Sequence, residues 1–307
     1  MARTSIIIAT HSRPHLLPRA VKSAQAGGSD VEVVVVDDAS TDETANVCKT
    51  LDGIRYVRTN ENKRTAGARN LGIAVSTAPY LGFLDDDDWR LPGSLDKQVK
   101  ILESDPDVGL VYGQYLSSDQ TGLITDDQPI PLVCPQGDVF WKVLEGPIFG
   151  CLTAVFRREC IERVGLLDPD YSGADDWDLW VRILEVYEAA AIEEPVAVWR
   201  KPGRDSDQGS ANMSKLYSLA ARAYKKKWLS LPRVRRECGD DPVLLRRRLL
   251  RQLSEHIVYD MVYGTRSRSD TLRKLVEVVR CYPPRLLELS FYSMLARNVF
   301  QGGSTPK

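Results

Sequence analysis

The sequence has few of the residues that build disulfide frameworks, histidine-rich metal sites or membrane spans. Its 307 residues include six cysteines, scattered without a CxxC pair, and only three histidines. Isolated thiols of this kind are typical of a reduced, cytoplasmic protein and argue against a zinc site. No uninterrupted run of about 18 apolar residues is present, so we expect no transmembrane helix.

The first residues also lack the features of an export signal. Residues 1–5 lead directly into a β-branched stretch, with no apolar signal region or cleavage site. This agrees with the cytoplasmic location that the thiols indicate. No glycine-rich basic loop for a triphosphate follows the first predicted strand, which argues against a nucleotidyltransferase of that type.

The net charge of −1 conceals two parts of opposite sign. Residues 1–209 carry 34 acidic and 21 basic side chains, whereas residues 210–307 carry 8 and 20. An acidic first part suits a cation-dependent site, and a basic second part suggests an anionic partner. The apolar share of 43% is ordinary for a globular protein with a sizeable core.

Apolar β-branched runs alternate with helical patterns through the first part of the chain. This alternation predicts an α/β fold with a mostly parallel sheet and helices on both faces. A flexible loop is expected over residues 117–137, which are polar and rich in proline. The predicted strands cover residues 5–9, 31–36, 54–57, 79–84, 108–113 and 189–199. Two predicted helices cover residues 17–24 and 66–75, and two more are predicted to begin near residues 43 and 173.

Polar side chains follow three of the predicted strands. They are Thr10 and His11, the pair Asp37 and Asp38, and the four aspartates of residues 85–88. In a parallel sheet the carboxyl ends of the strands form one edge, where ligands bind. Four adjacent carboxylates repel one another, and Mg²⁺ or Mn²⁺ is a natural counter-charge. The alternative is a solvated acidic loop.

Five motifs, in order, resemble the family 2 inverting glycosyltransferases of the GT-A fold, over roughly residues 4–200. The resemblance implies transfer of a sugar from a nucleotide-sugar, with a UDP-sugar as the expected donor, to an acceptor hydroxyl in surface polysaccharide or glycolipid biosynthesis. It implies a catalytic domain over residues 1–205, with a nucleotide-sugar half over about 1–100 and an acceptor half over about 101–205. The motifs are SIIIATHSRPHLL, VEVVVVDDASTDET, NKRTAGARNLGI, YLGFLDDDDWRLPGSL and GADDWDLWVRI.

The resemblance assigns nucleotide-binding roles to residues near the predicted strand ends. Asp38 is expected to accept a hydrogen bond from the base, and His11 to stack on it. Thr10 and Arg13 belong to the same turn, and the guanidinium of Arg64 suits the diphosphate. Each has a structural alternative: a turn or cap for Asp38, a packing role for His11 and a solvated surface position for Arg64.

The resemblance also places a metal ligand and a base. It aligns Asp87 with the metal-binding aspartate and leaves either Asp85 or Asp86 facing the ribose. The cation would neutralise the departing nucleoside diphosphate. Asp176 is the expected catalytic base for the acceptor hydroxyl. The alternative is that Asp175 and Asp176 only cap the following helix.

One departure from the family concerns the metal. Many relatives carry a histidine after the last strand, whereas this chain has none there. Either the cation has fewer protein ligands, or Lys201 and Arg204 help to neutralise the diphosphate.

The last hundred residues lie outside the resemblance. Residues 206–307 are predicted to form a basic helical extension, with the arginines of 246–248 among leucines. This extension is either a lid or homodimer surface with a solvated basic face, or a contact with an anionic membrane bearing a lipid-linked acceptor. No nucleic-acid motif accompanies the charge. A nucleotidyltransferase and a non-catalytic sugar-nucleotide-binding protein remain the alternative functions.

Overall fold

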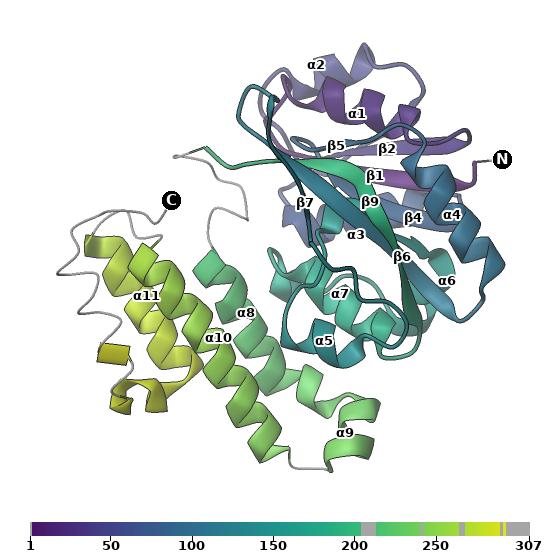
Figure 1. Ribbon diagram of the computed structural model, residues 1–307. Helices are drawn as coiled ribbons and strands as arrows, with labels where there is room; N and C mark the ends of the chain where they lie inside the picture. The colour runs from purple at the N-terminus through teal and green to yellow at the C-terminus, as the bar shows by residue number, and fades with distance from the viewer. Residues whose placement is uncertain (1, 204–212, 240–241, 264–267, 289–290, 293–307) are drawn as a thin grey trace. The chain divides into compact units, whose positions relative to one another are not determined.

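The computed structural model describes residues 2–203, 213–239, 242–263, 268–288 and 291–292 (Figure 1). The chain divides into two compact units, Met1–Asp205 and Ser206–Lys307. The first unit has the predicted α/β architecture, and the described residues of the second form helices.

One sheet runs through the first unit. In its described residues the strands are β1 (Thr4–Thr10), β2 (Val31–Asp37), β3 (Ile54–Arg58), β4 (Tyr80–Asp85), β5 (Trp89–Arg90), β6 (Val108–Ser118), β7 (Ile124–Ile130), β8 (Val155–Arg157) and β9 (Glu188–Arg200). Their order is β3-β2-β1-β4-β8-β6-β9-β5, with β7 paired to β6 beside this path. The strands β1 to β4 pair in parallel, so the carboxyl ends of β1, β2 and β4 meet at one edge.

Helices cover both faces of this parallel part. They are α1 (Leu17–Ala26), α2 (Thr44–Lys49), α3 (Arg64–Val75), α4 (Ser94–Ser104), α5 (Phe140–Glu145), α6 (Arg158–Val164) and α7 (Asp175–Leu184), with 3-10 turns at Cys151–Thr153 and Pro169–Tyr171. Ile6 and Ile8 join the core cluster that includes the buried face of α1. The residue between them, Ile7, faces α3, where a Cβ on Gly72 would lie 2.3 Å from Ile7 Cγ2. Burial on both faces explains why β1 is apolar without alternation.

Two features of the sheet differ from the sequence-based expectation. The predicted loop over residues 117–137 contains the strand β7, which pairs antiparallel with β6. The prediction of a loop was wrong because β7 is exposed along almost its whole length, and exposed edge strands tolerate proline and charge. In addition, β8 runs antiparallel between β4 and β6.

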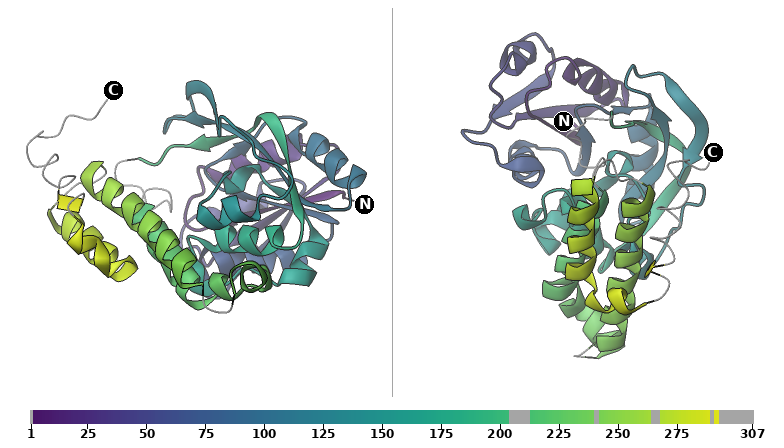
Figure 2. Two further views of the ribbon diagram at one scale, coloured as in Figure 1. Left: turned by 60° about the horizontal axis from the view of Figure 1, so that its bottom comes forward. Right: turned by 90° about the vertical axis from the view of Figure 1, so that its left-hand side faces the viewer.

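The second unit is a helical bundle, seen from two further directions in Figure 2. Its helices are α8 (Met213–Lys226), α9 (Pro232–Cys238), α10 (Val243–Tyr263) and α11 (Arg268–Cys281), with 3-10 turns at Trp228–Ser230 and Pro283–Leu287. Helix α10 packs on both α8 and α11, and α11 also packs on α8. Among the described residues, no helix combines the length and the apolar character needed to cross a membrane.

Candidate active site

The parallel pairing of β1 and β4 brings the tetra-aspartate loop next to the turn after β1. Thr10 Oγ1 donates a hydrogen bond of 2.7 Å to Asp86 Oδ2. Arg13 Nη1 lies 3.1 Å from Asp86 Oδ1 and 3.2 Å from Asp87 Oδ2. Four of the predicted site residues therefore form one network at the carboxyl edge of the sheet.

The carboxylates of this loop are largely buried. Asp86, Asp87 and Asp88 are each nearly inaccessible to solvent. Burial raises the pKa of Asp87 to about 7, and repulsion from Asp85 and Asp86 acts in the same direction. Burial likewise raises the pKa of Asp86 and Asp88. The guanidinium groups of Arg13 and Arg200 lower the pKa of Asp87 but do not outweigh burial and repulsion, so a bound cation would be favourable there.

Two other elements hold the acidic loop in place. Asp88 Oδ1 accepts a hydrogen bond of 2.8 Å from the backbone N–H of Arg200 in β9. Arg19 of α1 donates to the carbonyl of Asp87 over 3.0 Å, and its guanidinium lies 3.8 Å from the centre of the Trp89 ring. The loop is thus anchored on α1 and β9 as well as on β4.

The first aspartate after β2 closes a turn. Asp37 is fully buried, and its two oxygens accept hydrogen bonds of 2.8 Å from Ser40 N–H and from the hydroxyl of Tyr56. Both carboxylate oxygens of Asp37 are therefore already hydrogen-bonded within the protein. The second aspartate, Asp38, is therefore the one positioned to meet a ligand.

Asp38 retains an acceptor oxygen. Its Oδ1 accepts hydrogen bonds from Thr59 Oγ1 (2.9 Å) and from the backbone N–H of Lys63 (2.8 Å). In residues 2–203, and in the described part of the second unit, no group donates to Asp38 Oδ2. His11 lies beside it, with Nδ1 2.7 Å from the carbonyl oxygen of Asp38 and the ring exposed. An acceptor and an aromatic ring thus lie next to each other at the sheet edge.

Backbone strain gathers at the same edge. Ser12, Ala39 and Arg64 have φ angles of 54°, 57° and 59°, in the left-handed region that non-glycine residues rarely adopt. They follow β1, follow β2 and begin α3. Such conformations cost about 1–3 kcal/mol each and cluster at ligand sites. Nothing in the sequence signals them, because none of the three is glycine or asparagine.

Arg64 is the predicted site residue that joins no network. Its side chain is exposed and makes no hydrogen bond or ion pair with any residue that the structure describes. Its backbone N–H donates to Asn62 Oδ1 over 3.0 Å, which holds the start of α3. The guanidinium is therefore available to an anion approaching the edge.

A buried arginine that the sequence analysis missed connects the acidic loop to the segment of the predicted base. Arg69 of α3 is 5% exposed, and its Nη2 lies 2.8 Å from Asp85 Oδ1. Its Nη1 lies 3.1 Å from Oδ2 of Asp175, whose side chain is 1% exposed. A signal was present: Arg69 stands between Ala66 and Ile73 on the apolar face of the predicted helix, where a charge requires a buried partner.

Asp176 is the second residue of α7, directly after the residue that Arg69 binds. It is half-buried, and its Oδ1 accepts a hydrogen bond of 2.8 Å from the backbone N–H of Trp177. The N-cap of α7 is Ala174, and Asp175 and Asp176 lie in the first turn, where their negative charge also favours the start of the helix. Trp177 lies in the core and donates from Nε1 to the carbonyl of Val143. The buried tryptophan anchors the turn that presents Asp176.

The family assignment follows from a comparison with protein families. The family described as "Glycosyl transferase family 2" matches residues 5–165, which is just over half of the chain. The protein belongs to glycosyltransferase family 2. The matched segment contains the acidic loop, Asp38, Arg64 and Arg69, and it ends before Asp176.

Two curated relatives illustrate the family. The succinoglycan biosynthesis protein ExoU of Rhizobium meliloti (strain 1021) is 38% identical over 208 residues, covering 58% of this chain and 56% of ExoU. The UDP-Glc:alpha-D-GlcNAc-diphosphoundecaprenol beta-1,3-glucosyltransferase WfgD of Escherichia coli is 28% identical over 194 residues, covering 61% and 72%. The chain spans between about a third and just over half of the length of several relatives that it matches.

A solved structure supports the fold. The mannosyltransferase PcManGT of Pyrobaculum calidifontis, determined in complex with GDP-Man and Mn²⁺, aligns with 98% of this chain at a TM-score of 0.57. The sequence identity is 21%, and the match covers 88% of that chain. At this identity the likeness concerns the fold, which is that of the GT-A glycosyltransferases.

The described residues offer few protein ligands for a metal ion. In the part of the chain that the structure describes, no three His, Cys, Asp or Glu side chains converge on one point. Lys201 lies on the surface, with Nζ 3.4 Å from Thr125 Oγ1, and Arg204 lies outside the described residues. Any cation at Asp87 would thus take most of its ligands from a phosphate and from water, as Mg²⁺ commonly does.

The raised pKa of Asp87 predicts how stability depends on pH without divalent cations. The folded protein keeps a proton on Asp87 up to about pH 7, whereas the unfolded chain releases it near the ordinary value of 3.8. Stabilisation present at pH 4 should therefore be lost as the pH rises toward 7. Denaturation midpoints in EDTA measure this, and Asp87→Asn should flatten the slope. An identical slope in the variant would contradict the assignment.

Proposed function

We propose that this protein is an inverting, metal-dependent glycosyltransferase that transfers a sugar from a UDP-sugar to an acceptor hydroxyl in surface polysaccharide or glycolipid biosynthesis. The observation that carries the proposal is the shared carboxyl edge of β1, β2 and β4, next to which Asp38 and Asp87 lie. Arg69 links Asp85 of this edge to Asp175, the residue before Asp176. The names of ExoU and WfgD support the polysaccharide setting and the uridine nucleotide.

Asp38 and His11 bind the base in this proposal. Uracil presents a donor, N3–H, which suits the acceptor Asp38 Oδ2, and the exposed ring of His11 offers a stacking surface. Thymine has the same donor, whereas cytosine has an acceptor at that position. A carboxylate acceptor therefore favours UDP and dTDP over CDP. Arg64, exposed at the start of α3, would bind the diphosphate, where its fixed positive charge is favourable.

Asp87 holds the metal ion in this proposal. Arg13 and Arg200 do not outweigh the burial and carboxylate repulsion that raise the pKa of Asp87, so a cation would be stabilised there, and the Mn²⁺ in the PcManGT complex supports use of a divalent ion. A bound cation would neutralise the charge that develops on the leaving diphosphate. Both oxygens of Asp86 already accept hydrogen bonds from Thr10 and Arg13, whereas the side chain of Asp85 is half exposed. We therefore assign the ribose-facing role to Asp85.

Asp176 acts as the general base. The acceptor oxygen bonds to the anomeric carbon as the bond from that carbon to the diphosphate oxygen breaks, and the proton of the acceptor hydroxyl passes to Asp176. This single displacement inverts the anomeric configuration and requires no protein nucleophile. The side chain of Asp176 is accessible to an acceptor, whereas that of Asp175 is buried against Arg69.

The two halves of the first unit divide these roles. Asp38 and Asp87 fall within residues 1–100, which we assign to donor binding. Asp176 falls within residues 101–205, which we assign to the acceptor. Strand β7, which is exposed along most of its length, belongs to this second half.

Thermal unfolding with nucleotides tests this function. We expect UDP with Mn²⁺ to raise the melting temperature, dTDP to act more weakly, and CDP to have little effect. A ligand at about 100 times its Kd adds roughly 2.7 kcal/mol to the stability of the native state. Asp87→Ala should abolish the part of the rise in melting temperature that depends on Mn²⁺. Asp38→Ala should abolish the preference for UDP over CDP. Asp127→Ala, an exposed acidic position on β7, is the matched control. No shift with any nucleotide would overturn the proposal.

A further inference from the structure

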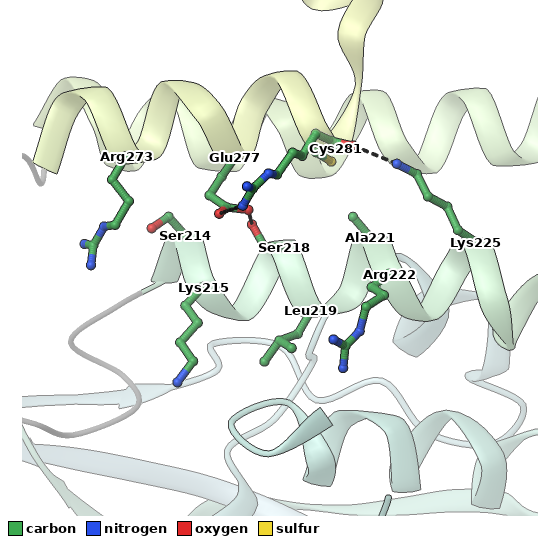
Figure 3. A pocket seen from close by; sticks show the side chains of 11 residues that line it. Ser214, Lys215, Ser218, Leu219, Ala221, Arg222, Lys225, Arg273, Glu277 and Cys281 are labelled. Atoms are coloured by element: carbon green, nitrogen blue, oxygen red, sulfur yellow. Dashed lines mark hydrogen bonds and ion pairs between the residues drawn. The ribbon is translucent and has the colours of Figure 1, made fainter. Parts of the chain in front are cut away.

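A basic groove lies between α8 and α11 in the second unit (Figure 3). It encloses about 520 Å³, and the described residues that line it belong to these two helices. Five basic side chains line it: Lys215, Arg222 and Lys225 from α8, and Arg273 and Arg280 from α11. The described residues that line it include none of the proposed donor site.

The positive charge of the groove exceeds the acidic charge next to it. Glu277 is the acidic residue of the lining, and it accepts from Ser218 Oγ (2.6 Å) and pairs with Arg280 Nη1 (3.2 Å). Asp270, outside the lining, pairs with Arg273. Lys225 Nζ donates to the backbone carbonyl of Arg280 over 2.7 Å. By sequence, α8 carries four basic and no acidic residues, and α11 carries four basic and two acidic residues, so the two helices together favour an anionic ligand.

The groove is also partly apolar and adjoins exposed apolar side chains. Leu219 and Ala221 of α8 belong to its lining. On α11, Leu272 is 63% exposed and Val276 is 40% exposed, each one residue before a lining residue. These two lie one helical turn apart, so they form a short apolar stripe beside the basic one. A soluble phosphate uses only the cations, whereas a membrane lipid uses both stripes.

The basic residues that line the groove are not the arginines of α10 that stand out in the sequence. In α10, Arg247 donates to the hydroxyl of Tyr282 over 3.2 Å. Arg251 pairs with both Glu255 and Glu288. Part of the basic character of α10 is thus used within the bundle, while α8 and α11 together form the concave basic site.

We propose that the groove between α8 and α11 binds the phosphate headgroup of an anionic membrane lipid, with Leu272 and Val276 entering the apolar layer. The lining includes basic residues of both helices, so a headgroup bound there would contact α8 and α11 together. Binding of this kind holds the catalytic unit at a membrane surface. It does not depend on which nucleotide or acceptor the first unit uses.

Co-sedimentation of the full chain with vesicles tests the proposal. We expect binding to phosphatidylglycerol-containing vesicles, weaker binding at high salt, and none to pure phosphatidylcholine. A basic residue near an anionic surface contributes roughly fivefold to binding. The double variant Arg273→Gln/Arg280→Gln should therefore weaken vesicle binding roughly 25-fold. The control, Arg246→Gln/Arg248→Gln, removes the same charge from exposed positions of α10 and should weaken binding much less.

Three results would overturn the proposal. Equal losses in the two double variants would show diffuse attraction rather than a site. Absence of binding to anionic vesicles would exclude the lipid. Binding of inorganic diphosphate to the groove, with no binding of the protein to vesicles, would identify a soluble anion as the ligand.

The variant Leu272→Ser should reduce vesicle binding without changing diphosphate binding, because it removes only apolar contact. The UDP-dependent thermal shift should persist in every groove variant, which separates this proposal from the proposed function.

Discussion

Replacing Asp176 by asparagine should lower the rate of sugar transfer by about 10²-fold or more while leaving donor binding unchanged. Asparagine has the size of aspartate, and its side-chain oxygen can still accept from the N–H of Trp177, so the start of α7 should be preserved. What is lost is a group able to take the proton of the acceptor hydroxyl. Single-turnover rates with saturating donor measure the loss, and the UDP-dependent thermal shift measures donor binding.

The matched control for this variant is Asp170→Asn. Asp170 is an exposed aspartate on the preceding 3-10 turn, so its replacement should leave turnover near that of the wild type. Turnover by Asp176→Asn at a similar rate would show that another group is the base. Loss of donor binding in that variant would instead show a structural role. A sugar-nucleotide-binding protein without catalysis would bind UDP and transfer nothing in either form.

Replacing Arg69 by methionine should destabilise the first unit by about 3–5 kcal/mol, because it leaves two carboxylates without their shared cation. One of them, Asp175, is nearly inaccessible to water. Burial already raises its pKa, and the guanidinium of Arg69 opposes that shift. Without the arginine, Asp175 should take up a proton more readily, so the deficit should shrink as the pH falls. Urea denaturation at several pH values measures both effects.

The control for Arg69→Met is a second buried arginine in the same unit. Arg182 pairs with Asp178 over 2.9 Å and donates to backbone carbonyls near α6. Arg182→Met should also destabilise the unit. Its melting temperature should nevertheless still rise on addition of UDP with Mn²⁺. In Arg69→Met that response should weaken, because Asp85 loses the group that positions it. A stability change of only about 1 kcal/mol in Arg69→Met would contradict the pairing.

Much of the first unit was predictable because its signals are local. Burial on both faces makes β1 and β2 continuous runs of isoleucine and valine, and the polar groups that follow a run mark the end of a strand. Parallel pairing then brings those ends to one edge, so Thr10, Asp38 and Asp87 were expected at the same edge and are found there. The ordered motifs added the family, which the comparison with known families confirms.

The roles of individual site residues remain predictions, but the structure sorts residues that look alike in the sequence. Asp37 and Asp38 are adjacent aspartates, yet one closes a turn and the other keeps an acceptor oxygen. Asp175 and Asp176 are also adjacent, yet only the first is buried against Arg69. Neighbouring residues of one type point in different directions from the backbone, so their partners depend on which other elements lie beside them.

The sequence by itself determined the alternation of strands and helices up to β4, the polar edge, the family and the basic character of residues 206–307. The tertiary structure alone decided the edge strand β7, the strained turns, the pairing of Arg69 with Asp85 and Asp175, and the groove between α8 and α11. The physical reason is the range of the interactions. Hydrophobic periodicity acts within one element and can be recognised in a short window, whereas ion pairs and concave surfaces join residues that are far apart in the chain.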